Sequence, residues 1–279
     1  MGYTAKTNLS RFFVYIALFI LLIIVIVPIW LLLVNATRST AEIQQGLSLL
    51  PSTHTIDNYN ILVGRGLNLP RGFANSLFLS IVTTFITIYF AFLAAYGIAA
   101  YNFRGKRVFR GFVVVLVLIP MQLAVIGYFQ YMSRFGLTDT YASLIFPAFA
   151  AAAAVFFAVQ YFEAIYIKDL VEAGRIDGAS ELGIFHRIMM PIAIPGAVTL
   201  GIFTFIGTWN NFFTPFILIS SIEKYTLPML VQLMKGDVYR TEYGAIYLGL
   251  AVTIVPVIII YLFLSRYIIS GIAMGSVKE

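Results

Sequence analysis

Residues 12–34 read FFVYIALFILLIIVIVPIWLLLV, a run of 23 residues without one charged side chain. A helix of this length extends over roughly 35 Å, because each residue adds about 1.5 Å, and the hydrocarbon core of a bilayer is about 30 Å thick. This stretch is therefore expected to be a membrane-spanning helix.

Five further runs lack charge in the same way. The six predicted spans are residues 12–34, 73–101, 111–133, 141–162, 191–222 and 243–265. The composition agrees, since 61% of the 279 residues are hydrophobic, 11% are charged and the mean hydropathy is +0.93. No water-soluble domain of this length has such values. The sequence predicts an all-α, polytopic membrane protein, with residues 1–279 forming a single transmembrane domain.

The Lys and Arg residues indicate how the chain is oriented. Arg104, Lys106, Arg107 and Arg110 crowd into the short turn between the second and third predicted spans, and short loops rich in Lys and Arg remain in the cytoplasm. The N-terminus, the C-terminus and the loop of residues 163–190 are then also cytoplasmic. Because the net charge of +6 is explained by orientation, nucleic acid is not expected as a partner.

None of the predicted spans contains Asp, Glu, Lys, Arg or His. Ion-driven carriers normally need such groups within the membrane to bind and release the driving ion, so this class is disfavoured. The sequence also lacks the G-x-x-x-x-G-K-[ST] pattern that cradles nucleotide phosphates. If the chain pumps a solute, the energy therefore comes from another subunit.

Catalytic residues and metal ligands are not expected. The chain has no cysteine, and its two histidines, His54 and His186, lie on opposite sides of the membrane in the predicted topology. No histidine pair can then bind a metal or perform acid–base chemistry. We expect a transport protein that is not an enzyme and that binds no cofactor itself.

The polar groups within the predicted spans are neutral amides and hydroxyls. They suit a neutral, hydroxyl-rich solute, because amides can hydrogen-bond hydroxyls and aromatic rings can stack on sugar faces. Hydrogen bonds between helices are an equally open interpretation of these groups, and Trp209 could instead serve packing or the membrane interface. The candidates for the translocation pathway are Gln122, Trp209, Asn210 and Asn211.

The loop of residues 163–190 is expected to form a helix over residues 165–177, a break at Gly178, and a second helix over residues 180–189 that stops at Pro191. Leu170, Ala173, Gly174 and Ile176 give the first helix a small apolar patch with charged residues around it. The residues alone leave two interpretations open: a knob that docks on a partner, or a lid on the lipid headgroups. The loop's five acids against three bases weaken the second.

This loop resembles the EAA loop of ABC importer permeases. The family pattern is E-A-A-x3-G-x9-I-x-L-P, and the chain has Glu172-Ala173-Gly174, then Gly178, then Ile188-Met189-Met190-Pro191. The extended stretch EAGRIDGA (residues 172–179) is similar to E-A-A-x-I-D-G-A of the maltose-type carbohydrate branch. Gly174 replaces an Ala, Met190 replaces a Leu, and Ile167 replaces a frequent Pro. Residues 205–212 (FIGTWNNF) and 271–278 (GIAMGSVK) extend the similarity.

The resemblance implies the type I ABC importer permease fold in a prokaryotic cell (inner) membrane. Its implied partners are a second homologous permease subunit forming a heterodimer, an ABC ATPase dimer that carries ATP and Mg, and an extracytoplasmic solute-binding protein. The implied ATPase-coupling residues are Glu172, Ala173, Gly174, Asp177, Gly178, Ala179, Ile188 and Pro191. The tail at Lys278 and Glu279 is similar to tails that touch the ATPase, and the outside loop of residues 223–242 corresponds to one that reaches the binding protein.

The function implied is import of a neutral di- or oligosaccharide by alternating access. Two alternatives stay open at this point. One is an ABC permease for a non-sugar solute, and the other is a facilitative carrier that needs no ATP.

Overall fold

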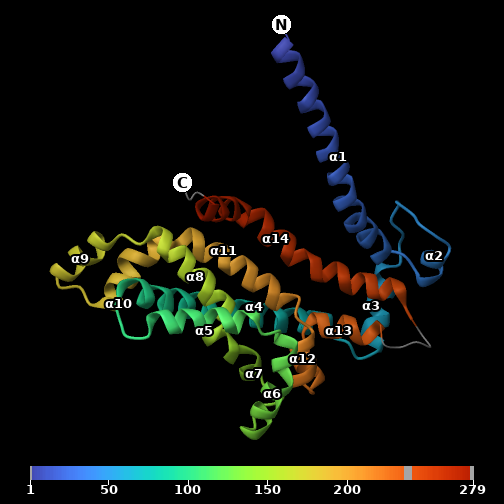
Figure 1. Ribbon diagram of the computed structural model, residues 1–279. Helices are drawn as coiled ribbons and strands as arrows, with labels where there is room; N and C mark the ends of the chain where they lie inside the picture. Colours follow the sequence, from blue (N-terminus) through green and yellow to red (C-terminus); the bar gives the residue numbers. More distant parts are fainter. Residues whose placement is uncertain (1, 236–240, 277–279) are drawn as a thin grey trace. The chain divides into compact units, whose positions relative to one another are not determined.

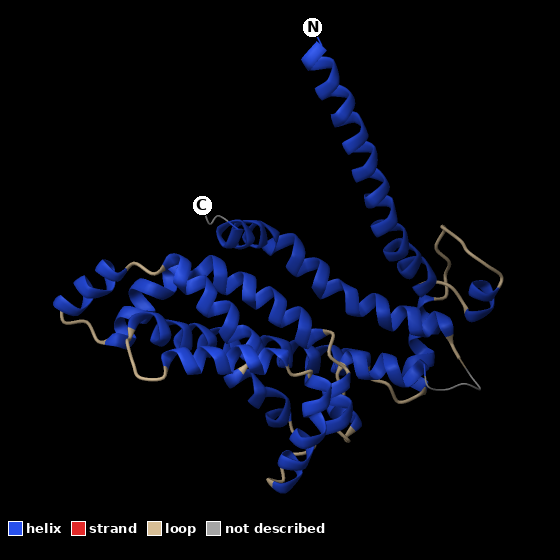
Figure 2. Ribbon diagram, in the orientation of Figure 1, coloured by secondary structure: helices blue, strands red, loops and turns tan. Residues whose placement is uncertain are grey.

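The computed structural model describes residues 2–235 and 241–276, and within these ranges the chain forms helices and loops without a strand (Figure 2). The predicted all-α class is confirmed. The chain divides into two compact units, one of residues 1–69 with 230–254 and the other of residues 70–229 with 255–279. Each unit is described by itself below.

The first unit is built around a buried arginine. Arg38, which is 7% exposed, donates from Nη1 to Asn35 Oδ1 at 3.0 Å and to the Gly46 carbonyl at 3.1 Å. Asn58 Nδ2 donates to the carbonyls of Ala36 and Arg38, at 3.0 Å each. These bonds satisfy polar groups that would be costly to bury unpaired. The helices of this unit are α1 (Gly2–Ala36), α2 (Thr40–Gln44), α3 (Thr55–Gly64), most of α13 (Leu227–Lys235) and the first turns of α14 (Tyr243–Ser276).

The second unit contains most of the helices. Within it, α8 packs against both α5 and α11, and α9 packs against α10; Figure 1 shows α4, α5, α8 and α11 side by side. Its core includes Phe92, Phe162 and Phe185, all fully buried. The elements are α4 (Leu69–Ala100), α5 (Lys106–Leu118), α6 (Met121–Arg134), α7 (Tyr141–Ile145), η1 (Phe146–Ala150), α8 (Ala152–Ile165), α9 (Lys168–Ile176), α10 (Glu181–Ile184), η2 (Phe185–Met189), α11 (Met190–Trp209), α12 (Phe213–Leu218) and η3 (Ile222–Lys224).

Five helical segments of the described chain are long and apolar enough to cross a membrane, and a bent pair of helices makes a sixth candidate. The five are residues 11–36, 69–100, 141–165, 181–209 and 243–263. They contain or overlap five of the six predicted spans. The chain is therefore a multi-pass membrane protein with the expected number of apolar crossings when the bent pair counts as one.

The sixth candidate corresponds to the span predicted over residues 111–133, but it is divided into two helices. Residues 106–118 and 122–134 form two helices that meet at an angle of 101°. Proline disfavours the helical conformation of the residue before it and has no N–H to donate. Ile119, which precedes Pro120, is accordingly extended, with φ −77° and ψ 120°.

The predicted fifth span ran from residue 191 to residue 222, but α11 ends at Trp209. The short α12 follows after Asn210, Asn211 and Phe212. Asn211 Oδ1 accepts a hydrogen bond from the Thr214 N–H at 3.2 Å, which satisfies a free amide at the start of α12. Neutral asparagines therefore end the helix without interrupting the uncharged run.

The second loop helix was expected to stop at Pro191, and this expectation is wrong. Residues 181–209 form one continuous helical segment, in which Pro191 lies in the first turn of α11. The residues just before it, 185–189, form the π-type turn η2, and the Met190 N–H donates to the Phe185 carbonyl. This wider turn accommodates a residue that cannot donate its own hydrogen bond, so the helix continues past the proline.

Candidate functional site

The predicted coupling loop turns sharply between α9 and α10. Gly178 has φ +77°, a left-handed conformation that glycine adopts without steric cost. Its N–H donates to the Arg175 carbonyl at 3.0 Å, and the Ala179 N–H donates to the Gly174 carbonyl at 3.0 Å. This pair of bonds is the Schellman motif that closes a helix at glycine. Ser180 then caps α10 by accepting from the Gly183 N–H at 3.2 Å.

Charged and aromatic side chains hold the two arms of the loop together. Arg175 Nε donates to Glu181 Oε1 at 2.7 Å across the turn. Tyr96 of α4 donates its hydroxyl to Glu181 Oε2 at 2.7 Å, and the Arg175 guanidinium lies 5.6 Å from the centre of the Tyr101 ring. The Glu181 carboxylate raises the pKa of Arg175 by accepting its hydrogen bonds. The loop is therefore fixed to the end of α4.

A separate ion pair lies on the exposed side of α9. Lys168 Nζ lies 3.0 Å from Glu172 Oε1, one helical turn away. Accepting this hydrogen bond, Glu172 raises the pKa of the lysine. Because both side chains are largely exposed, the pair contributes little to stability, and Glu172 remains accessible to a partner.

The inner face of the loop is part of the protein core. Val171, Ile184, Phe185 and Met189 are fully buried. A Cβ at Gly174 would lie 3.1 Å from Ile188 Cδ1 and 3.2 Å from Ile184 Cγ1. The glycine that departs from the family pattern thus lets α9 approach the next helix closely.

The outer face carries most of the predicted coupling residues. Glu172, Ala173, Asp177, Gly178, Ala179 and Pro191 are exposed, whereas Ile188 is half-buried and Gly174 is buried. Two apolar side chains are exposed there as well: Ile176 of the predicted apolar patch, at 85%, and Leu182, at 56%. Leu182 was missed because an apolar residue in a short helix shows its direction only after the helix has packed.

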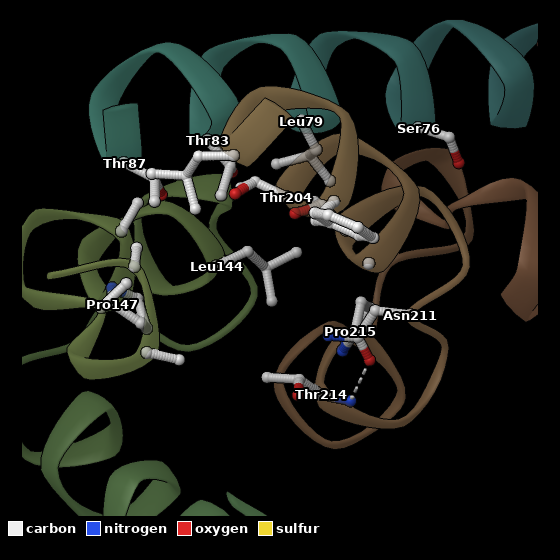
Figure 3. Close-up of a pocket in the computed structure, with 18 of the residues that line it drawn as sticks. Ser76, Leu79, Thr83, Thr87, Leu144, Pro147, Thr204, Asn211, Thr214 and Pro215 are labelled. Carbon is white, nitrogen blue, oxygen red and sulfur yellow. Dashed lines mark hydrogen bonds between the residues drawn. The ribbon is translucent and has the colours of Figure 1, made fainter. Parts of the chain in front are cut away.

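A cavity of about 600 Å³ lies within the second unit. Figure 3 shows Thr83 and Thr87 of α4, Thr204 of α11 and Leu144 of α7 around it. Its size is typical of small-molecule sites, and no charged residue of the described chain lines it. The polar lining residues are Ser76, Thr83, Thr87, Thr204, Thr208, Asn211, Thr214 and Thr226.

Two of these hydroxyls have no hydrogen-bond partner among the described residues. The Oγ1 atoms of Thr83 and Thr226 are buried and make no hydrogen bond within the described chain. Ser76, by contrast, accepts from the Leu227 N–H at 2.8 Å. Buried polar groups are normally paired, so the unpaired hydroxyls of Thr83 and Thr226 distinguish these two residues from the rest of the lining.

The four predicted pathway residues are placed differently from one another. Asn211 lines the cavity, whereas Gln122 and Asn210 are exposed elsewhere. Trp209 is 1% exposed and packs between aromatic rings, 5.9 Å from Phe205 and 5.4 Å from Phe73 by ring centres. The cavity threonines of α4 were not singled out from the sequence, because hydroxyls are common in membrane helices and only packing decides which of them face inward.

A clamp of hydrogen bonds around Asp139 was also missed. Asp139 has the left-handed φ of 58°, and its Oδ1 accepts from the N–H groups of Ser220 and Ser221 at 3.0 and 2.9 Å. Its Oδ2 accepts from the Ser221 hydroxyl and from Lys224 Nζ, the latter at 3.0 Å. The Ser221 bonds and Lys224 hold the Asp139 pKa well below its usual range. The clamp joins the turn before α7 to the segment after α12.

The described residues cover only part of the predicted C-terminal tail and of the predicted outside loop. Lys278 and Glu279 of the predicted tail lie outside the described residues, as do residues 236–240 of the loop predicted over residues 223–242.

Comparisons with known proteins agree with the geometry. The family described as "Binding-protein-dependent transport system inner membrane component" matches residues 87–273. The arabinooligosaccharides transport system permease protein AraQ of Halalkalibacterium halodurans is 35% identical over 250 residues, covering 89% of each chain. AraQ of Bacillus subtilis is 33% identical, covering 98% of this chain and 96% of that one. A crystal structure of a bacterial ABC transporter involved in the import of the acidic polysaccharide alginate contains a chain with TM-score 0.81 and 23% identity, covering 96% of this chain and 99% of that chain.

The chain therefore belongs to the family of binding-protein-dependent inner-membrane transport components, and the resemblance to ABC importer permeases is confirmed. A permease of this family is a transport component and not itself an enzyme. Membership implies an ATPase and a solute-binding protein as partners, and it implies the inner membrane of a prokaryote as the location.

The Asp139 clamp predicts a pH dependence. A carboxyl whose pKa is lower in the folded protein contributes stability above its unfolded pKa, near 3.9, and loses that contribution as the pH falls through its folded pKa. Asn also tolerates the left-handed backbone of residue 139, so Asp139→Asn removes the negative charge with little change in size or backbone conformation. We expect Asp139→Asn to melt below the wild type at pH 7, with a difference that narrows below about pH 4, as measured by thermal unfolding in detergent. A difference that stays constant between pH 7 and pH 3 would contradict the assignment.

Proposed function

We propose that the chain is a permease subunit of an ATP-driven importer for a neutral di- or oligosaccharide. The observation that carries this proposal is the 600 Å³ cavity, whose mostly apolar lining also carries hydroxyls and one amide but includes no charged residue of the described chain. Such a surface can exchange hydrogen bonds with sugar hydroxyls while offering no counter-charge to an ion. The names of the two AraQ relatives support an oligosaccharide as the solute.

We propose that the coupling loop is where the ATPase acts on this chain. The exposed residues of α9 and the following turn form a knob on a rigid base, because Val171, Ile184 and Phe185 anchor it in the core. Under this proposal the knob docks on an ABC ATPase dimer that carries ATP and Mg, while this chain binds no cofactor. A second, homologous permease completes a heterodimer around the pathway.

Transport is proposed to follow alternating access. ATP-driven closure of the ATPase dimer would move the docked loop, and the loop would move the helix that lines the cavity. Converting a population from 1:99 to 99:1 needs a difference of about 5.5 kcal/mol between the two states. Differential docking of the loop on the ATPase is the proposed source.

The first test asks whether the cavity hydroxyls contact the solute. Thr83 and Thr84 both have a buried hydroxyl without a partner in the described chain, but only Thr83 lines the cavity. If the Thr83 hydroxyl stabilises the sugar during transport by about 1 kcal/mol, Thr83→Val lowers the maximal uptake rate about fivefold. Thr84→Val is the matched control and should transport at close to the wild-type rate.

The measurement is ATP-dependent uptake by vesicles that contain the purified importer, with labelled oligosaccharides, amino acids and phosphate offered in turn. Uptake of an amino acid or phosphate in preference to every sugar would contradict the proposed substrate. Equal uptake with and without ATP would instead indicate a facilitative carrier. Equal rates for Thr83→Val and Thr84→Val would remove Thr83 from the pathway.

The second test separates docking from helix stability at Glu172. Glu172→Lys should weaken retention of the ATPase during purification about tenfold or more, since it reverses a charge on the proposed contact face. The double variant Lys168→Glu/Glu172→Lys restores an ion pair along α9 but leaves the reversed charge at residue 172. We expect it to lose the ATPase as well. Recovery of the ATPase by the double variant would show that Glu172 acts only through its pair with Lys168.

A further inference from the structure

The start of α5 carries more positive charge than its surroundings neutralise. Arg104, Lys106, Arg107 and Arg110 contribute four positive charges within seven residues, and α5 has no acidic residue in its first turn. In the described chain the one acid paired with them is Glu163 of α8, which contacts Arg110. Four cations and one acid leave a net charge of about +3 at the start of the helix. Neither Arg104 nor Arg107 forms an ion pair within the described chain, and both side chains are exposed.

These cations lie in line with a small apolar cavity. At about 100° per residue, Lys106, Arg107 and Arg110 fall within roughly 120° of the helix circumference, and Val113 and Val114 continue the same stripe one turn further. Arg110, Val113 and Val114 line a cavity of about 90 Å³, whose other walls come mainly from apolar side chains of α4 and α8. The order along the helix is thus positive charge first and apolar surface next.

Arg110 connects the two parts of this stripe. One end of its guanidinium pairs with Glu163, while its Nε is buried and has no hydrogen-bond partner within the described chain. An unpaired donor of a charged group is costly to bury. An anionic oxygen entering beside the cavity would accept this hydrogen bond.

The position of α5 favours the head group of an anionic lipid over other anions. The helix forms the first half of the bent candidate span, so its cations lie where the chain enters the membrane and its valines lie deeper. Val108, Phe112 and Val115, on the opposite side of this helix by the same spacing, are 75%, 56% and 55% exposed, as expected of a helix with a face turned to lipid chains. Basic pockets between membrane helices bind the head groups of anionic lipids, at about 1 kcal/mol for each Lys or Arg.

We propose that the α5 stripe, defined as Arg104, Lys106, Arg107, Arg110, Val113 and Val114, binds one anionic phospholipid. The phosphate of the lipid lies among the four cations, and the upper part of an acyl chain enters the cavity at Val113 and Val114. The site is separate from the sugar cavity and from the exposed face of the coupling loop. The ligand is a structural or regulatory lipid and not the transported solute.

The test uses the full-length chain, purified in mild detergent with the subunits that accompany it. Native mass spectrometry measures the binding of phosphatidylglycerol and of phosphatidylcholine with the same acyl chains. We expect phosphatidylglycerol to bind more tightly. Arg104→Gln/Arg107→Gln should weaken it about 30-fold, because two lost charges amount to about 2 kcal/mol at 1.4 kcal/mol per tenfold. Arg134→Gln, which removes an exposed charge from α6, is the matched control and should bind like the wild type.

A second variant distinguishes a built site from general attraction to charge. Val114→Phe fills the cavity and leaves every cation in place, so it should also weaken phosphatidylglycerol binding. Equal binding of the two lipids, an unchanged affinity in Arg104→Gln/Arg107→Gln, or an equal loss in Arg134→Gln would overturn the proposal. Displacement of the lipid by millimolar inorganic phosphate would identify a site for free phosphate instead. Should Val114→Phe fail to fold, the exposed arginine pair still decides the outcome.

Discussion

The proposed coupling depends on one continuous helical segment. Residues 181–209 form a single segment of 29 residues, about 43 Å long at 1.5 Å per residue. Its first turns lie in the coupling loop, where Ile184 and Phe185 are fully buried, and its last turns carry Thr204 and Thr208 to the cavity. Under the proposed mechanism, a force applied to the loop would be transmitted along this helical segment to the cavity wall.

The continuity of this segment depends on how the chain accommodates Pro191. A proline inside a helix leaves a carbonyl unpaired and clashes with the preceding turn. Here the π-type turn of residues 185–189 provides the extra space, and the buried ring of Phe185 holds that turn in the core. Pro120 has no such turn before it, and there the chain bends by 101°. The same residue type therefore lies within a continuous helical segment at one position and at a sharp bend at the other.

The sequence predicted the membrane spans well, because charge is costly in hydrocarbon and its absence can be counted along the chain. It could not predict where the spans end, since Asn210 and Asn211 end α11 without carrying charge. The break at Gly178 was also predicted, because a left-handed residue favours glycine. The continuation of the helix through Pro191 was not predicted, because it depends on the five residues before Met190 adopting a wider turn and packing in the core.

The candidate site was only partly accessible to sequence reasoning. The spacing from Glu172 to Pro191 indicated the coupling loop, and the structure places most of those residues on an exposed face. The cavity was harder to predict. Asn211 was selected because amides can hydrogen-bond sugar hydroxyls, but Thr83 and Thr87 resemble many other threonines until α4 has packed. Trp209 was selected because an aromatic ring can stack on a sugar, yet it is buried between Phe73 and Phe205.

The most direct test of the central claim is a distance measured within the helical segment as the transporter turns over. The chain contains no cysteine, so spin labels can be placed at Leu182→Cys and Phe203→Cys, both exposed in the described structure. Pulsed electron paramagnetic resonance would compare the assembled importer without nucleotide and with ATP trapped. The account predicts the same sharp distance in both states. A distance that shortens or broadens when ATP is trapped would show that the segment bends, and would contradict transmission of loop movement through a rigid helix.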